Sequence, residues 1–203
     1  MKIAVLGATG MAGSRIVAEA LRRGHEVTGI ARNPEKLPPQ DRLTLRKGDA
    51  LAAGLSDLLR GHDVLVSAVH FSIVPPEAVL EPARAAGVKR LVVVGGAGSL
   101  EVAPGVQLVD TPEFHEEWKP EALGGRAFLE TLKKQAADLD WTFLSPSALF
   151  MPGERTGRFR RGTDQLLTDG AGKSHISAED YAIALLDEIE NPEHIRQRFT
   201  VGY

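Results

Sequence analysis

Short apolar runs and longer amphipathic segments alternate along the chain. Most of the apolar runs are continuous, a pattern typical of strands that helices cover on both faces of a parallel sheet. The third run alternates apolar and polar residues instead, which also fits a strand. The pattern predicts seven strands, at residues 2–6, 26–31, 43–47, 63–69, 90–95, 141–145 and 198–203.

The segments between these runs place their apolar residues at helical spacing. Gly24, Gly61 and Gly87 each follow such a segment, at the position where a glycine commonly ends a helix. Ser177, followed by acidic residues, is a typical start for the last helix. Helices are predicted at residues 11–23, 51–60, 76–86, 120–139 and 177–190, and the glycine pair 124–125 weakens the start of the fourth.

Strands that alternate with helices predict an α/β fold, a doubly wound Rossmann-type parallel sheet in three layers, formed as a single domain over residues 1–203. Right-handed crossovers bring the carboxyl ends of the strands to one edge, where such sheets bind ligands. Residues 150–173 break the alternation and are rich in Gly and Arg. We expect them to form an insertion over that edge, with a short hairpin at residues 164–168.

The loop after the first strand, Gly7-Ala8-Thr9-Gly10-Met11-Ala12-Gly13, leads directly into the first predicted helix. Its glycine spacing differs from the usual GxGxxG fingerprint, but the physical reason is shared. Small residues let backbone amides approach a pyrophosphate, and the helix N-terminus favours its negative charge. A tight turn without a ligand is the alternative. The residues expected to bind a dinucleotide here are Gly7, Ala8, Thr9, Gly10 and Met11.

The end of the second strand bears on which dinucleotide is bound. An acidic residue there would bind the ribose 2′-hydroxyl of NAD, but the sequence has Arg32, about 20 residues beyond the glycine loop. An arginine suits a 2′-phosphate, because it can donate two parallel hydrogen bonds to it. Lys36 adds positive charge nearby. The sequence therefore favours NADP(H) over NAD(H), with an unliganded surface arginine as the alternative.

The ends of the remaining strands complete the expected cofactor site. Asp49 either accepts a hydrogen bond from the adenine amino group or caps the helix that follows. Small residues after the fourth strand suit a floor under the ribose. Glycines after the fifth strand leave room for the nicotinamide ring, although a loop with positive φ angles needs glycines as well. These positions are Asp49, Ala50, Ser67, Ala68, Val69, Gly95, Gly96 and Ala97.

Polar and aromatic residues expected near the same edge are candidates for substrate contacts. His70 is a candidate proton donor or substrate contact, and an ordinary loop histidine is the alternative. Trp118 and Phe150 could stack on a planar molecule, although aromatic side chains more often serve packing. Arg155 could pair with a phosphate or carboxylate unless it belongs to a solvated basic loop. Ser147, just past the sixth strand, is included in this group.

Composition excludes several other classes of protein. The chain has no cysteine, so disulfides, thiolate metal sites and a cysteine nucleophile are excluded, and no metal site is predicted. The net charge of −3 and the lack of clustered basic residues argue against nucleic-acid binding. No apolar stretch reaches the roughly 20 residues of a membrane span. The first residues do not have the pattern of a signal peptide, so we expect a cytoplasmic protein without a membrane partner.

Several of these motifs together resemble one family, the atypical short-chain dehydrogenase/reductases. Within it the chain is similar to the NAD(P)H-binding group of NADH-flavin reductases, near biliverdin reductase B and the NmrA-like proteins. This resemblance spans essentially the whole chain and implies a Rossmann fold, a nicotinamide cofactor and a small planar acceptor such as FMN or another flavin. The matching segments are Gly7 to Gly13, Arg32-Asn33-Pro34, Gly48-Asp49, Val93 to Leu100, Trp141 to Ser147, Pro152 to Gly157 and Ser174 to Ala182.

One feature of the typical short-chain dehydrogenases is missing. Those enzymes use a Tyr-x-x-x-Lys pair, but Leu185 stands four residues after Tyr181, and Tyr203 is the last residue of the sequence. The missing pair favours hydride transfer to a flavin or a tetrapyrrole over ketone reduction, because an isoalloxazine ring accepts hydride directly. A non-catalytic NADP(H) sensor of the NmrA-like type is the alternative. An epimerase or dehydratase normally needs the pair and is less favoured. A monomer or a homodimer is expected.

Overall fold

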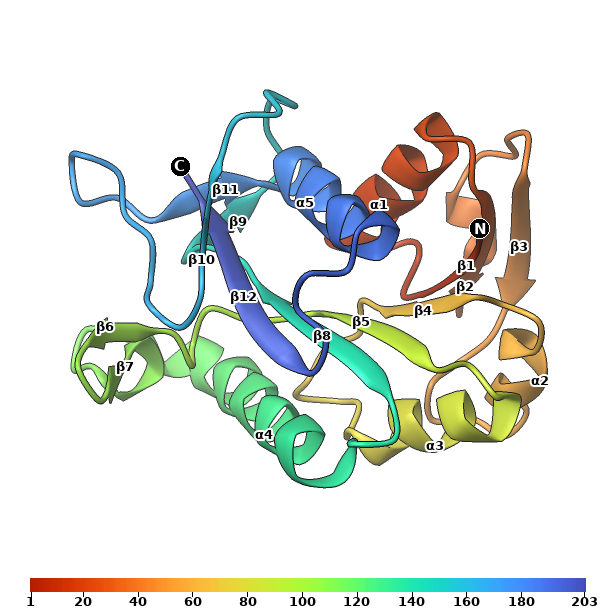
Figure 1. The fold of residues 1–203 in the computed structure, drawn as a ribbon, viewed down its shortest axis with the longest axis horizontal. Helices are drawn as coiled ribbons and strands as arrows, with labels where there is room; N and C mark the ends of the chain where they lie inside the picture. Colours follow the sequence, from red (N-terminus) through yellow and green to blue (C-terminus); the bar gives the residue numbers. More distant parts are fainter.

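The apolar runs of the sequence form an eight-stranded sheet in the computed structural model, which describes residues 1–203 (Figure 1). Its strand order is β10-β12-β8-β5-β4-β1-β2-β3. All neighbouring pairs are parallel except β10 and β12. The strands are β1 (Lys2–Leu6), β2 (Glu26–Ala31), β3 (Leu43–Lys47), β4 (Val64–Ser67), β5 (Arg90–Val94), β8 (Asp140–Ser145), β10 (Arg160–Gly162) and β12 (Gln197–Gly202).

The connections between strands change direction beside β1. The chain runs outward from β1 through β2 to β3, returns to β4 on the other side of β1, and then continues outward through β5, β8 and β12. In doubly wound sheets the crevice at such a switch point, outside the carboxyl ends of the strands, is the place where ligands bind. The fold therefore directs attention to the loops that follow β1 and β4.

Helices cover both faces of the sheet, as Figure 1 shows. One face carries α1 (Met11–Arg22) and α5 (Ala178–Glu190), and the other carries α2 (Leu55–Leu59), α3 (Glu77–Ala86) and α4 (Lys119–Gln135). A buried apolar cluster lies beneath each helical layer, with 22 residues on the α1 side and 21 on the α4 side. The predicted three-layer Rossmann-type fold is confirmed.

Most predicted boundaries agree with the structure, and the predicted cap of the last helix is present. Each of the seven predicted strands forms, and its ends lie within two residues of those expected. The Ser177 side chain accepts a hydrogen bond from the amide of Asp180 at 3.0 Å and so begins α5. Gly87 ends α3 in the left-handed conformation, with φ at 75°.

The helix predicted at residues 51–60 is wrong in its length. Helix α2 begins only at Leu55, after Gly54 with φ at 91°. Asp49 accepts a hydrogen bond from the amide of Leu51 at 3.0 Å, so it closes a local turn and does not cap the helix. The shortened α2 leaves part of the outer sheet face uncovered beside β2 and β3.

The hairpin predicted at residues 164–168 is also wrong. The short strand β10 precedes it and pairs antiparallel with β12, where it satisfies the backbone groups of the outermost parallel strand. Residues 164 and 166 instead exchange backbone hydrogen bonds of 2.8 Å with Glu101. Two small sheets were not predicted: β6 (Glu101–Ala103) with β7 (Val106–Gln107), and β9 (Leu149–Met151) with β11 (His175–Ser177).

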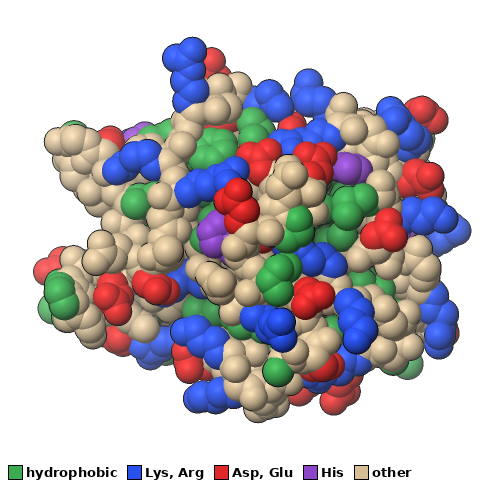
Figure 2. All heavy atoms as spheres, in the orientation of Figure 1, with side chains coloured by type: hydrophobic (Ala, Val, Ile, Leu, Met, Phe, Trp, Pro, Cys, Tyr) green, Lys and Arg blue, Asp and Glu red, His purple; other side chains and the backbone are tan.

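Charged side chains of both signs are interspersed over the face seen in Figure 2. Many form ion pairs between elements that are distant in sequence. Arg23, which directly follows α1, for example, contacts Asp187 at 2.9 Å and Glu190 at 2.7 Å, both on α5. Ion pairs therefore link the two helices of this layer, in addition to the apolar contacts beneath them. No helix in the structure is both long enough and apolar enough to cross a membrane.

Candidate cofactor site

The turn after β1 depends on glycine. Gly7 has a φ of +84°, a conformation in which a side chain is strained. A Cβ on Gly7 would also lie 2.3 Å from the backbone oxygen of Ala68, which follows β4. A Cβ on Gly13 would lie 2.2 Å from the backbone oxygen of Gly7. The turn is therefore pressed against the end of β4, at the switch point of the sheet.

The first turn of α1 offers backbone amides that the protein itself does not use. Gly10 is the N-cap residue, and no side chain caps the helix. The amides of Met11, Ala12 and Gly13 have no acceptor in the protein, and the first helical bond runs from Ser14 to Gly10. The turn also has no acidic residue. Free amides at the positive end of the helix dipole favour an anion such as a pyrophosphate.

A cavity of about 230 Å³ opens beside this turn, at the carboxyl ends of β1, β2 and β4. Four segments form its walls: the glycine turn, the residues after β2, the residues after β3 and the loop after β4. Its lining consists of Leu6, Gly7, Thr9, Gly10, Ile30, Ala31, Arg32, Asn33, Lys36, Gly48, Asp49, Ala50, Leu51, Ala68, Val69, His70, Ile73 and Val74.

The end of the cavity beyond β2 carries positive charge. Arg32 is exposed, and its side chain makes no hydrogen bond or ion pair within the protein. Lys36 comes from the short 3-10 helix η1 (Pro34–Lys36) and lines the same cavity. Asp49 is the one acidic residue in the lining. This end can therefore attract a phosphate without first having to break an internal ion pair.

Two exposed apolar side chains lie at the rim of the cavity. Leu51 and Ile73 are each 57% exposed, although both belong to the lining. Both therefore offer exposed apolar surface to a molecule bound in the cavity. Their position near Asp49 suits the two flat faces of an aromatic base whose polar edge meets the carboxylate.

Glu121, a residue that was not predicted from the sequence, holds the loop after β4 in place. Glu121 of α4 accepts hydrogen bonds from the amides of Phe71 and Ser72, both at 2.9 Å, and from the Ser72 hydroxyl at 2.6 Å. Burial alone would raise the pKa of Glu121, but these hydrogen bonds outweigh it and hold the pKa below its usual range. His70, at the cavity wall, has its Nδ1 3.7 Å from the same carboxylate.

Several expected cofactor residues lie outside the cavity. Ala8 and Ser67 are buried, so their side chains support the site from behind. Met11 is 37% exposed on α1 but does not line the cavity. Residues 95–97 follow β5 at the same sheet edge and also lie beyond the lining. A Cβ on Gly95 would lie 2.4 Å from the ring of Phe143, so this glycine serves packing.

The substrate candidates do not come together around the cavity. Only His70 lines it. Trp118 is 53% exposed and packs against His115, with ring centroids 4.4 Å apart. Phe150 packs against the buried Tyr181, with centroids 4.6 Å apart. These two aromatic residues therefore have protein partners of their own.

The structure shows internal contacts for Ser147 and Arg155, two of the expected substrate residues. Ser147 is buried and donates a hydrogen bond to the backbone oxygen of Val201 at 2.9 Å. Arg155 pairs with the buried carboxylate of Glu19 on α1, at 2.9 Å. Arg155 therefore fixes the first part of the expected insertion against α1, and it does not line the cavity.

Neither tyrosine can take the place of the missing catalytic pair. Tyr181 is buried and donates a hydrogen bond to the backbone oxygen of Leu144 at 2.7 Å. Its burial raises the pKa of its hydroxyl. The hydroxyl of Tyr203 lies 2.7 Å from Asp180 and 2.9 Å from Ser177. Both hydroxyls are committed to internal contacts away from the cavity.

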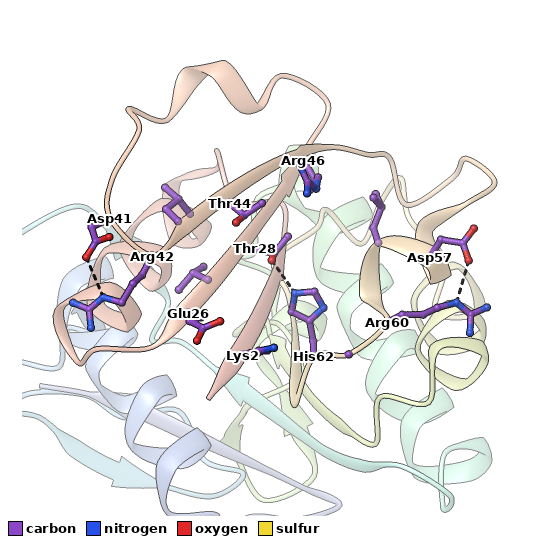
Figure 3. Close-up of a pocket in the computed structure, with 14 residues that line it drawn as sticks. Lys2, Glu26, Thr28, Asp41, Arg42, Thr44, Arg46, Asp57, Arg60 and His62 are labelled. Atoms are coloured by element: carbon purple, nitrogen blue, oxygen red, sulfur yellow. Dashed lines mark hydrogen bonds and ion pairs between the residues drawn. The ribbon is translucent and has the colours of Figure 1, made fainter.

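A larger hollow of about 690 Å³ lies elsewhere, beside the amino ends of β1, β2 and β3 (Figure 3). It is the part of the sheet face that the short α2 leaves uncovered. Most of its lining is polar, and several of its charges are already paired, as in Arg60 with Asp57 at 3.1 Å. His62 contacts Thr28 across it at 2.8 Å. Its one glycine, Gly61, precedes a strand and no helix N-terminus belongs to the lining, so the hollow lacks the features of a dinucleotide site.

Comparisons with known proteins agree with this geometry. Residues 7–192 match the model of a family described as NAD(P)H-binding. Over 211 aligned residues the chain is 44% identical to the uncharacterized protein YwnB of Bacillus subtilis, covering 99% of this chain and 98% of that protein. A solved structure from Burkholderia pseudomallei, named a “putative exported protein”, is 50% identical, with a TM-score of 0.90 and full coverage of both chains.

Two further solved structures have names that mention an activity. A “putative epimerase” from Bacteroides thetaiotaomicron is 41% identical, with a TM-score of 0.92, over 100% of this chain and 96% of that one. A “putative NADH-flavin reductase” from Streptococcus pneumoniae is 36% identical, with a TM-score of 0.86, over 100% and 99%. These relatives confirm the resemblance to atypical short-chain dehydrogenase/reductases. From its family match and its glycine turn, this chain belongs to the NAD(P)H-binding family of Rossmann-fold proteins.

Proposed function

We propose that this protein is an NADPH-dependent reductase that transfers hydride to a planar acceptor such as a flavin. The observation that carries the proposal is the pairing of two features in one cavity. The uncapped first turn of α1 suits a pyrophosphate, and the unpaired Arg32 lies where a 2′-phosphate would follow from it. NADPH contains both groups, with one ribose between them.

The residues of the cavity fit the rest of the cofactor. Leu51 and Ile73 would flank the adenine, and Asp49 would accept from its amino group. Gly7 allows the turn to pack directly against Ala68 at the end of β4, and the ribose and phosphates would approach beside this turn. When bound, NADPH supplies the hydride from its nicotinamide ring; the protein contributes position and the exclusion of water.

We infer the kind of acceptor from the lack of a tyrosine acid beside the cavity. Carbonyl reduction and sugar epimerisation by the usual short-chain route need a tyrosine acid, and both tyrosines here are held in internal contacts. A flavin or a quinone takes up hydride without a positioned acid of that kind. The relative from Streptococcus pneumoniae, whose name mentions NADH-flavin reductase, supports this class of acceptor.

Oxidation of NADPH, followed by its absorbance with FMN, riboflavin and simple quinones, tests the proposal. We expect turnover well above the rate without enzyme with at least one of these acceptors, and a lower KM for NADPH than for NADH. Anaerobic assays would separate flavin reduction from reaction with oxygen. A rate equal to the background with every acceptor would refute a reductase of this class.

A sensor that binds NADP(H) without turnover is a second candidate. It is favoured by one observation: His70 is the only titratable candidate substrate residue at the cavity, so the site has little catalytic equipment. Such a sensor would bind NADP⁺ and NADPH with similar affinity, or would prefer NADP⁺, and would retain a protein partner in a pull-down. A reductase should show turnover and no requirement for a partner.

A further inference from the structure

Helix α4 contacts the loops that follow both β4 and β5, although it lies outside the cavity itself. Four residues near its start make these contacts, and we call them the α4 seat: Glu121, Ala122, Gly124 and Gly125. The loop after β4 forms one wall of the cavity through Val69, His70, Ile73 and Val74.

Glycine is unfavourable inside a helix, but the two glycines of the α4 seat are needed for close packing against Phe71. A Cβ on Gly124 would lie 2.8 Å from the backbone oxygen of Phe71, and a Cβ on Gly125 would lie 3.1 Å from its ring. The Phe71 ring in turn packs on Phe128 and Phe143, with centroids 5.3 and 5.9 Å away. Phe71 is therefore locked between α4 and the sheet, and the loop that carries it is fixed at that point.

The same stretch of α4 also fixes the loop after β5. A Cβ on Gly98 would lie 2.7 Å from the Cβ of Ala122, so the two backbones are in close contact. The carbonyl of Gly98 also accepts a hydrogen bond from the amide of Val109 at 2.9 Å. The loops after β4 and β5 thus depend on one helical surface for their position.

We infer that Glu121 is a positioning residue of the cofactor site, which sets the affinity for NADPH by holding the loop after β4 as a cavity wall. The inference rests on the proposed binding of NADPH. Its basis is that the Glu121 carboxylate accepts three hydrogen bonds from two consecutive loop residues. Two of the donors are backbone amides, so the contact fixes the path of the chain and not merely one side chain.

Calorimetric titration of NADPH into matched variants tests the inference. In Glu121→Gln the side chain keeps its shape but has one acceptor oxygen and presents an N–H₂ group toward the loop donors. We expect its Kd for NADPH to rise about tenfold, a change of about 1.4 kcal/mol. Glu121→Asp keeps both acceptor oxygens on a shorter stem and should recover part of the loss. Glu117→Gln removes an exposed charge nearby and should bind within twofold of the wild type.

The titrations are done well below the Tm of each variant, so that all of the protein is folded. A contact that serves only stability would then lower the Tm and leave the Kd for NADPH unchanged. Ser72→Ala, which removes one of the three hydrogen bonds, provides a milder variant and should raise the Kd two- to threefold even if Glu121→Gln does not fold. If the Glu121 and Ser72 variants fold and bind NADPH with wild-type Kd values, the inference about Glu121 is overturned but the proposed function is not. Failure of the wild type to bind NADPH would overturn the proposed function and the inference with it.

Discussion

We expect Arg32 to be the residue in this site that distinguishes NADPH from NADH. Its side chain has no partner in the protein, so its charge is available to a 2′-phosphate. Hydrogen bonds to charged groups contribute about 1.5–3 kcal/mol. We therefore expect Arg32→Ala to weaken NADPH binding about ten- to hundredfold and to leave the Kd for NADH within threefold. Titration of both cofactors measures the difference.

The control for this prediction is Arg60→Ala, which removes an exposed arginine from the hollow at the amino ends of the strands. Its loss changes the net charge equally, so a general electrostatic effect would weaken NADPH binding in both variants. A local contact between Arg32 and the 2′-phosphate would weaken NADPH binding in Arg32→Ala but not in Arg60→Ala. Equal Kd values for NADPH in Arg32→Ala and the wild type would show that no 2′-phosphate lies there.

Gly7 gives a second prediction at the scale of one residue. A left-handed backbone costs a residue with a side chain about 1–2 kcal/mol, and the contact 2.3 Å from Ala68 adds to that cost. We expect Gly7→Ala to lower the free energy of unfolding by about 3 kcal/mol. Urea unfolding measures it. Gly170→Ala, in open space without a positive φ, should stay within about 0.5 kcal/mol of wild type.

How far single residues could be predicted depended on how local their roles are. Gly7 and Arg32 stand at fixed offsets from the first two strands, so a strand pattern was enough to find them. The ion pair of Arg155 with Glu19 could not be predicted, because the two residues lie 136 positions apart in sequence. Glu121 was missed for the same reason, since its hydrogen-bond partners are 49 and 50 positions distant. No local pattern signals such pairs.

Helix α5 is tied to the sheet by a buried carboxylate, and this gives a prediction at the scale of elements. Glu188 accepts hydrogen bonds from the ring of His194 at 2.8 Å and from Arg90 of β5 at 3.1 Å. Burial would raise the pKa of Glu188, but its hydrogen bonds outweigh this and hold the pKa below its usual range. We expect Glu188→Gln to destabilise the fold by about 3 kcal/mol at pH 7, because it leaves Arg90 buried without a counter-charge.

The lowered pKa of Glu188 also determines how its contribution to the free energy of unfolding depends on pH. A carboxyl whose pKa is lower in the folded state stabilises the fold above its unfolded pKa of about 4.3, and this contribution is lost as the pH falls through the folded pKa. The difference in free energy of unfolding between the wild type and Glu188→Gln, measured with urea, should therefore become smaller from pH 7 to pH 3. Glu193→Gln, at an exposed neighbour, should show no gap at either pH. A constant gap for Glu188→Gln would contradict the assignment.

Among the elements, those with regular patterns were predictable and those shaped by tertiary contacts were not. The continuous apolar runs and the one alternating run predicted every parallel strand of the sheet. The start of α2 was misplaced because the turn at Asp49 uses residues that would also be acceptable in a helix. Strand β10 could not be recognised from Arg160-Arg161-Gly162, since it forms only because β12 offers an unpaired edge.

At the scale of the whole molecule, the direction of the strands predicts which of two hollows binds the cofactor. The hollow beside the amino ends of the strands is the larger one, at about 690 Å³ against about 230 Å³. Size alone would favour it. In a parallel sheet, however, helices begin at the carboxyl edge, so free helical amides occur only there. The hollow of Figure 3 has none, and its wall helix α2 has only five residues.

This polarity predicts that charges in the larger hollow have no influence on the cofactor. NADPH at about 100 times its Kd stabilises the fold by about 2.7 kcal/mol, which for a chain of this size raises the Tm by about 5–10 °C. We expect the double variant Arg46→Ala/Arg60→Ala to show the full rise, measured by thermal unfolding with and without NADPH. Arg32→Ala at the same NADPH concentration should lose most of it. The opposite result, a lost shift in the double variant and a full shift in Arg32→Ala, would move the cofactor to the amino-end hollow and would mean that cavity size outweighs the direction of the sheet.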